Sequence, residues 1–353
     1  MQNGITCATF SSLNQLAATA PEWRGLWLED RNATPFQSPD WLLPWARQFG
    51  LPDLRTIMVY DRGILVAILP LYRRLDPQTG ERQLLLLGAG TSDYLDGVYG
   101  PCCTEGHIRA ALSHICDEED WDALRVFQLK ENSLLRQVLE HFPSRGLRRV
   151  GAEGCSRLPA VPVNGLPRSI RDQAKYYRRR AMRQGNLELT AADETNWPDA
   201  FDALERLHSS RWQNSGQPGL LADRRILAWH REALPLLLRG GMLRLFTLSL
   251  SGEPIAMLYS LVDPPSRSPR VQYFYLTAFS IRHADLRPGT VMMALAIEHA
   301  ANEGVQIIDM LRGDESYKRL WRPEKLPTFG FSMPHLERSS SILRCADESK
   351  AAA

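Results

Sequence analysis

The sequence has no apolar run long enough to cross a bilayer and no recognisable secretion signal. Its longest apolar stretches, residues 63–72 and 84–87, fall well short of the roughly 18 residues that a membrane-spanning helix requires. Residues 1–12 lack a basic segment followed by an apolar one. The sequence therefore predicts a cytoplasmic protein without a transmembrane segment.

Cysteine is scarce and has no metal-binding pattern. The 6 cysteines are scattered without a CxxC pair, and histidines are not grouped with them at metal-ligand spacing. Both features argue against a disulfide framework and against structural zinc. A GxSxG serine motif is also missing. We expect reduced thiols, no metal site and no covalent serine intermediate.

Charge of one sign is not in excess. Lysine and arginine number 42 against 40 acidic residues, a net charge of +2, so no field covers the whole protein to collect nucleic acid or anionic membrane. DNA is not expected as a partner, and any polyanion site must be local. One basic helix is a local candidate for phosphate or RNA, although its near-neutral surroundings favour a solvated face. Its cations are Arg168, Arg171, Lys175, Arg178, Arg179, Arg180 and Arg183, interleaved with Tyr176 and Tyr177.

Length and composition indicate two folded units. The chain has 353 residues, of which 44% are hydrophobic and 23% charged, about twice the ~100–200 residues of an ordinary domain. The proline- and glycine-rich stretch 151–167 predicts the boundary. We therefore expect domains at residues 1–165 and 166–336, followed by a disordered tail at 337–353.

The same order of elements is expected in both halves. In the first, strands 54–60 and 64–72 are joined by Asp61, Arg62 and Gly63; in the second, strands 243–250 and 254–262 are joined at 251–253. This echo, about 190 residues apart, predicts duplication of a whole domain rather than a solenoid. Strand 271–279 alternates, which predicts one face carrying Val271, Tyr273, Tyr275, Thr277 and Phe279.

A turn with anion-binding character precedes the apolar helix 290–302. If Thr290 caps this helix, the amides of Val291, Met292 and Met293 are unpaired, with the positive end of the helix dipole behind them and Arg287 alongside. A pyrophosphate would fit there. On these residues alone, an ordinary turn built from Pro288 and Gly289 is the favoured alternative.

Asp309 lies on the predicted strand 305–311, on the same face as Val305, Ile307 and Leu311. A carboxylate among aliphatic neighbours loses hydration, so its pKa should rise, as a general base requires. The alternative is a structural Asp that pairs with Arg312 or with backbone amides.

The densest polar cluster runs from Arg312 to Trp321. If Asp314 begins a short helix, Glu315 meets Lys318 and Tyr317 meets Trp321 on neighbouring faces. An acid, a phenol and a cation so placed could accept a proton, protonate a leaving group and hold an anion. A solvated turn with a salt bridge is the alternative.

Two further groups of polar residues are weaker candidates. His208 reaches Arg211 and Trp212 along one helix, which fits either substrate positioning or packing. Asp93 lies in the short acidic loop 91–96, where a self-capping structural turn is favoured.

In this order, the motifs resemble the CelD/BcsL-type acetyltransferases of the GNAT superfamily, over residues 34–333. The motif around Asp309 to Trp321 is the most specific part. The matching positions are Pro70, Leu71, 92–96, Leu207, His208, Arg211, Trp212, Gly219, 253–256, 287–290, Asp309, 312–315, Tyr317, Lys318 and Trp321.

The resemblance implies an α/β (α+β) fold of two tandem GNAT-like acyltransferase domains, each a mixed, mainly antiparallel sheet flanked by helices, as in the related FemAB-type aminoacyl transferases. It implies donor binding at strand 271–279 and the following turn. Our mechanistic hypothesis places the base at Asp309 or Glu315, with Tyr317 serving the leaving group and Lys318 or Arg312 steadying negative charge. The donor residues would be Tyr275, Arg287, Gly289, Thr290 and Val291, and the acceptor residues His208, Arg211, Trp212, Arg312, Trp321 and Asp93.

The implied activity is direct acyl transfer, without a permanently bound cofactor. Acetyl-CoA or another acyl-CoA is the expected donor, and an amine or hydroxyl of a small molecule or glycan precursor is the expected acceptor, in cell-surface polysaccharide production. Proline in the turn departs from the family's glycine-rich loop, which leaves other activated donors open. Aminoacyl-tRNA is not favoured, because no long helical arm is present. A non-catalytic accessory protein for polysaccharide production is the other alternative.

Overall fold

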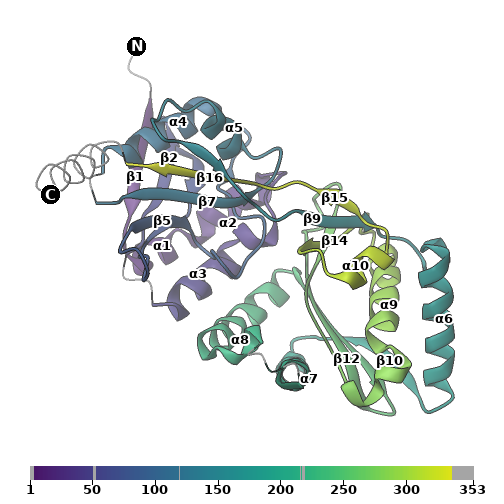
Figure 1. The fold of residues 1–353 in the computed structure, drawn as a ribbon. Coiled ribbons are helices and arrows are strands. Elements are labelled where there is room, and N and C mark those ends of the chain that lie inside the picture. The colour runs from purple at the N-terminus through teal and green to yellow at the C-terminus, as the bar shows by residue number, and fades with distance from the viewer. Residues whose placement is uncertain (1–3, 51–52, 119, 215, 217–218, 336–353) are drawn as a thin grey trace, which may run out of the picture. The chain divides into compact units, whose positions relative to one another are not determined.

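The structure is a computed structural model that describes residues 4–50, 53–118, 120–214, 216 and 219–335 (Figure 1). Contacts divide the chain into two compact units: a first unit of Met1–Glu153 with Pro327–Ala353, and a second unit of Gly154–Leu326. The predicted tail at 337–353 lies outside the described residues.

The first unit contains two sheets, of strand order β1-β2-β3-β6 and β4-β5-β7-β16-β8. Within the second of these, β5 and β7 are parallel and the other pairs are antiparallel. The elements are β1 (Ile5–Phe10), α1 (Leu13–Ala18), α2 (Ala20–Glu29), η1 (Pro35–Gln37), α3 (Pro39–Gln48), β2 (Thr56–Asp61), β3 (Ile64–Leu69), β4 (Leu71–Leu75), β5 (Arg82–Leu86), β6 (Val98–Tyr99), α4 (Glu105–Cys116), β7 (Ala123–Leu129), α5 (Leu134–Glu140), β8 (Arg148–Val150) and β16 (Phe329–Pro334).

Pro70 divides the predicted strand 64–72. β3 ends at Leu69 in one sheet and β4 begins at Leu71 in the other, so the prediction of one continuous strand was wrong. Proline has no N–H to donate to a neighbouring strand, which makes this the natural position for the chain to change sheets.

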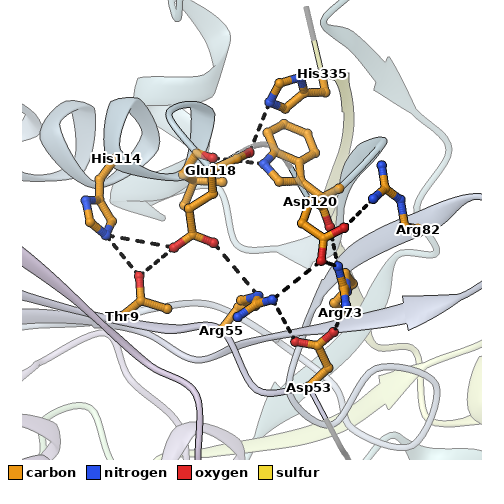
Figure 2. Close-up of polar contacts among 11 residues, drawn as sticks. Thr9, Asp53, Arg55, Arg73, Arg82, His114, Glu118, Asp120 and His335 are labelled. Atoms are coloured by element: carbon orange, nitrogen blue, oxygen red, sulfur yellow. Dashed lines mark hydrogen bonds and ion pairs between the residues drawn. The ribbon is translucent and has the colours of Figure 1, made fainter. Parts of the chain in front are cut away.

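An ion-pair network joins the two sheets of the first unit (Figure 2). Arg55 lies 3.1 Å from Asp53 and 3.8 Å from Glu118. Glu118 accepts a hydrogen bond of 2.6 Å from Thr9 on β1, and Asp53 pairs with Arg73 on β4. Charged groups from three separate segments thus hold β1 and β4 in place.

The second unit is built on one seven-stranded sheet, of order β10-β11-β12-β13-β14-β9-β15, in which β13 and β14 alone run parallel. The elements are β9 (Cys155–Pro159), η2 (Val163–Gly165), α6 (Arg168–Met182), β10 (Leu187–Ala191), α7 (Trp197–Asn214), η3 (Leu220–Ala222), α8 (Arg224–Arg239), β11 (Leu243–Leu250), β12 (Glu253–Val262), β13 (Val271–Phe279), η4 (Ile281–Leu286), α9 (Pro288–Asn302), β14 (Ile307–Arg312), α10 (Ser316–Leu320) and β15 (Glu324–Leu326).

Helices cover both faces of this sheet: α6 and α9 lie on one face and α7 and α8 on the other (Figure 1). Ile170 and Ala174 of α6 share a core with Ile297 of α9 and Phe274 of β13. The mixed, mainly antiparallel sheets flanked by helices confirm the predicted fold class.

The unit boundaries differ from the predicted 165 and 336. β9 lies within the stretch read as a linker, yet it pairs with β14 and β15 in the second unit. β16 lies beyond the second unit in sequence, yet it pairs with β7 and β8 of the first. Both differences come from strands that pair with partners far away along the chain, and such pairing leaves no local pattern.

Candidate functional site

The strands β13 and β14 separate soon after they meet. Their parallel pairing covers Val271 to Tyr273 against Ile307 to Asp309. β13 then continues to Phe279, paired with β12 alone in the described chain. One edge of its second half is therefore not covered by a strand of the described chain.

A β-bulge lies where the strands separate. Tyr259 of β12 pairs with Leu276 and the next residue, Ser260, pairs with Phe274, which leaves Tyr275 as the extra residue of β13. The Tyr275 ring lies 5.6 Å from the ring of His230 on α8. Bulges redirect side chains and are frequent beside active sites.

The bulge also reverses the faces beyond it. Thr277 pairs with Leu258, and Phe279 pairs with Ala256. Leu258 and Ala256 belong to the core on the α9 side, and Phe279 packs against that core. The predicted single face from Val271 to Phe279 was therefore wrong beyond Tyr275.

The turn before α9 is shaped differently from the prediction. Arg287, with φ of 44°, is the N-cap, and Pro288 is the first helical residue. The carbonyl of Arg287 accepts from the amide of Thr290 at 3.0 Å and from that of Val291 at 3.3 Å. Thr290 is thus not the cap, and the amide of Val291 is already used. Gly289 lies against Phe279, since a Cβ atom added there would be 3.6 Å from its ring.

Positive charge beside this turn comes from side chains. Arg287 donates to Gln173 of α6 at 3.0 Å, and its guanidinium carbon lies 5.3 Å from the ring centre of Tyr177. A cavity of about 170 Å³ between η2, α6 and α9 is lined by Lys175 and Arg178, together with Val291 and Glu298 of α9. Cations of α6 therefore lie next to the first turns of α9.

Asp309 is buried and held by the backbone. It is 4% exposed, and its Oδ1 accepts from the amide of Leu311 at 2.7 Å. Leu311 has φ of 59°, and the β14–β9 register shifts between Asp309 and Arg312, so the expected alternation stops at Asp309. Arg312, half-buried, ends the strand.

Lys318 supports the turn that follows β14. The residue is only 2% exposed. Its ammonium donates to the carbonyls of Leu311 at 3.3 Å and Arg312 at 2.5 Å, and it lies 2.9 Å from Oε2 of Glu315. Buried ammonium groups need such partners. The geometry makes Lys318 a positioning residue for the turn.

The Tyr317 phenol keeps its proton at neutral pH. Although the residue is 38% exposed, partial desolvation of its hydroxyl, and then the charge of Glu315, raise its pKa to about 12, and Arg211 opposes this shift. The guanidinium carbon of Arg211 also lies 4.9 Å from the ring centre of Phe279. The guanidinium of Arg211 on α7 therefore lies near residues of β13 and α10, although these three elements are far apart in the sequence.

Two neighbours of Tyr317 differ from the prediction. The short helix begins after Glu315, which is its N-cap, so Asp314 does not start the helix. The carboxylate of Asp314 accepts hydrogen bonds from Arg319 and Lys325, and these bonds lower the pKa of Asp314 to about 2. Trp321, expected to contact substrate, is 3% exposed and belongs to the hydrophobic core. Its position assigns it to packing.

His208, Arg211 and Trp212 gather on α7 as the spacing predicts. Burial, and then Arg211, lower the pKa of His208 to about 4, so its ring is neutral at pH 7. Its Nδ1 has no hydrogen-bond partner within the described residues. Gly219 packs on this group, because an added Cβ atom would lie 2.4 Å from Cε1 of His208 and 2.5 Å from Cδ1 of Trp212.

A buried polar group beside Asp309 was not predicted from the sequence. The hydroxyl of Tyr273 donates to Asp263 at 3.4 Å, and Arg267 lies 4.0 Å from Asp263. Burial, Asp263 and Asp309 raise the pKa of Tyr273. A strand-end Asp before two prolines reads as an ordinary turn, so the sequence carried no distinguishing signal.

Asp93 lies in the first unit, between β5 and β6, and is 4% exposed.

Among the residues that the structure describes, no group of three or more His, Cys, Asp or Glu side chains could hold a metal ion. In the same residues, no helix combines the length and apolarity needed to span a membrane.

Comparison with known proteins identifies the second unit. Residues 168–319 match the family profile described as Acetyltransferase (GNAT) domain. No curated protein sequence matches the chain significantly. Solved structures that match most of the chain include FemX, a lysylphosphatidylglycerol synthetase domain and L-PGS.

FemX has a TM-score of 0.64 at 13% identity, covering 89% of this chain and 95% of FemX. The carboxyl-terminal domain of a putative lysylphosphatidylglycerol synthetase from Agrobacterium fabrum has a TM-score of 0.58 at 11% identity, covering 95% of each chain. L-PGS from Bacillus licheniformis has a TM-score of 0.56 at 13% identity, covering 90% of this chain and 92% of L-PGS. Residues 168–319 therefore match a GNAT acetyltransferase domain, within a chain whose fold is similar to that of FemX.

Proposed function

We propose that the protein is a CelD/BcsL-type acyltransferase. It moves an acyl group from acyl-CoA, with acetyl-CoA as the first candidate, to an amine or hydroxyl of a small molecule or glycan precursor used in cell-surface polysaccharide production. The observation that carries the proposal is the separation of β13 from β14 at the Tyr275 bulge, within the residues that match the GNAT domain.

Donor binding is proposed at the edge of β13 that, beyond Tyr273, no strand of the described chain covers. An extended, amide-containing arm can pair with the backbone beyond Tyr273, as a peptide adds to the edge of a sheet. Arg287 and the α6 cations Lys175 and Arg178 flank the start of α9, where the donor's phosphates would lie. These side-chain charges would then bind phosphate in place of backbone amides of the turn that already donate within the protein.

The transfer step needs one base and one acid. The acceptor amine attacks the acyl carbonyl, so a C–N bond forms and the C–S bond of the thioester breaks. Glu315, or Asp309, takes the amine proton, and Tyr317 gives its proton to the departing thiolate. The charge of Arg211 opposes the rise in the pKa of Tyr317 and so favours the transient phenolate. Binding both reactants together supplies much of the rate.

A donor panel tests the proposal. The full chain is incubated with several acyl-CoA species and a set of amino sugars and amines, and thiol release and acylated masses are recorded. Thiol release coupled to an acylated product supports the proposal. Product from aminoacyl-tRNA alone would replace acyl-CoA as donor, and no product with either donor would favour an accessory role.

A further inference from the structure

Some cations of α6 are paired within the protein, and others on its outer face are not. Arg168 lies 3.7 Å from Asp172, and Arg180 donates to Asp285 at 2.7 Å. For the guanidinium groups of Arg178, Arg179 and Arg183, the described part of the chain supplies no ion pair or hydrogen bond.

These cations form a row because the opposite face of α6 is fixed in the core. Ile170, Ala174 and Ala181 are buried against the α9 side of the sheet. Arg179 and Arg183 are exposed on the outward side, one four-residue step apart, which is about 6 Å along the axis. The row cannot turn inward without unpacking the helix.

Large apolar side chains are exposed around this row. Tyr176 is 58% exposed, Met182 is 57% exposed, and Ile281 of the neighbouring η4 is 41% exposed. The contact between Arg180 and Asp285 holds η4 beside α6. We call this surface, made of Tyr176, Arg179, Met182, Arg183 and Ile281, the α6 face.

We propose that the α6 face docks the protein on an anionic lipid bilayer. Surface arginines and lysines are attracted to the phosphates of acidic lipids, and tyrosine and aliphatic side chains enter the interfacial region. RNA would also complement the charge, but Met182 and Ile281 offer it neither a phosphate contact nor a ring on which a base could stack. The apolar side chains therefore favour the bilayer. Docking is independent of the proposed acyl transfer, because it needs no turnover.

Vesicle flotation of the full chain tests this docking. We expect binding to vesicles of equal parts phosphatidylglycerol and phosphatidylcholine, weak binding to phosphatidylcholine alone, and a steep decrease with salt. The double substitution Arg179→Glu/Arg183→Glu should lower the partition coefficient roughly 30-fold or more, as expected for the loss of two surface cations. Tyr176→Ser/Met182→Ser should lower the binding that persists at high salt.

A matched pair of substitutions on the other side of the sheet serves as the control. Arg206→Glu/Arg224→Glu changes the net charge equally at two exposed residues of α7 and α8, and should leave binding unchanged. Circular dichroism confirms that each variant is folded. Equal binding to neutral vesicles, equal loss in both charge-reversal variants, or binding to duplex RNA under conditions where vesicles are not bound would each overturn the proposal.

Discussion

Nζ of Lys318 lies 2.9 Å from Oε2 of Glu315, although the lysine side chain is 3% exposed and the glutamate side chain 54%. The same ammonium donates to the carbonyl of Arg312 at 2.5 Å. A buried cation thus fixes the turn after β14 and keeps an accessible acid beside Tyr317.

Removal of this cation should destabilise the second unit. We expect Lys318→Met to cost about 1–3 kcal/mol, because the carbonyls of Leu311 and Arg312 lose a buried donor. Differential scanning calorimetry measures the loss. Lys325→Met, which removes an exposed partner of Asp314, should change stability by at most about 0.5 kcal/mol. Equal losses in both variants would contradict a supporting role for Lys318.

The Tyr317 hydroxyl should matter for rate and little for folding. Tyr317→Phe removes the proposed acid, so kcat should fall by about 10²-fold or more while the thermal midpoint stays near that of the unmodified protein. Steady-state thiol release measures kcat. Tyr176→Phe removes a hydroxyl on the outer face of α6 and should leave kcat unchanged. A Tyr317→Phe protein with full activity would exclude the phenol as the acid.

Gly219 should not tolerate a side chain. In Gly219→Ala the new methyl group would overlap Cε1 of His208 and Cδ1 of Trp212, so both rings must move. We expect a loss of about 1–3 kcal/mol and a higher KM for the acceptor. Gly25→Ala is the control, because a Cβ atom at this helical position meets nothing within 4 Å. A neutral Gly219→Ala would show that the two rings are not fixed by this contact.

Acid should affect the two units in opposite directions. Burial lowers the pKa of His208 to about 4 and that of His230 to about 3, whereas burial raises the pKa of Asp96 to about 6. Between about pH 6.5 and 4 the unfolded chain binds more protons at the histidines, so the second unit loses stability as pH falls. Between about pH 4 and 6 folded Asp96 binds more protons than unfolded Asp96, so the first unit gains stability as pH falls.

Hydrogen exchange at pH 7 and pH 5, corrected for intrinsic rates, separates the two units. His208→Gln should reduce the loss in the second unit, and Asp96→Asn should abolish the gain in the first. Parallel changes in both units would show that other groups dominate the pH dependence.

The network of Figure 2 should stabilise the first unit. Arg73→Met removes ion pairs to Asp53 and Asp120 and a 2.6 Å hydrogen bond to the carbonyl of Asp120, at a cost of about 1–2 kcal/mol. The neighbouring Arg74→Met removes one 3.4 Å contact with Gln83 and should have little effect. Thermal unfolding at low and high salt measures both, and the Arg73 effect should shrink with salt.

The sequence by itself determined the elements whose signals are local. The hairpin around Gly252, the basic helix at 168–182 and the strand carrying Asp309 follow from turn residues and periodicity over a few neighbouring positions. The spacing of His208, Arg211 and Trp212 likewise placed them together, because α-helical geometry fixes side chains three and four residues apart.

Only the tertiary structure decided the features that depend on distant partners. β9 and β16 each pair directly with strands that lie more than a hundred residues away, and the Tyr275 bulge exists only in the register with β12. Trp321 lies in the core because long-range packing, not its place in a polar motif, determines its burial. A local pattern records the conformation that a segment prefers, whereas pairing and burial depend on surfaces supplied by the rest of the chain.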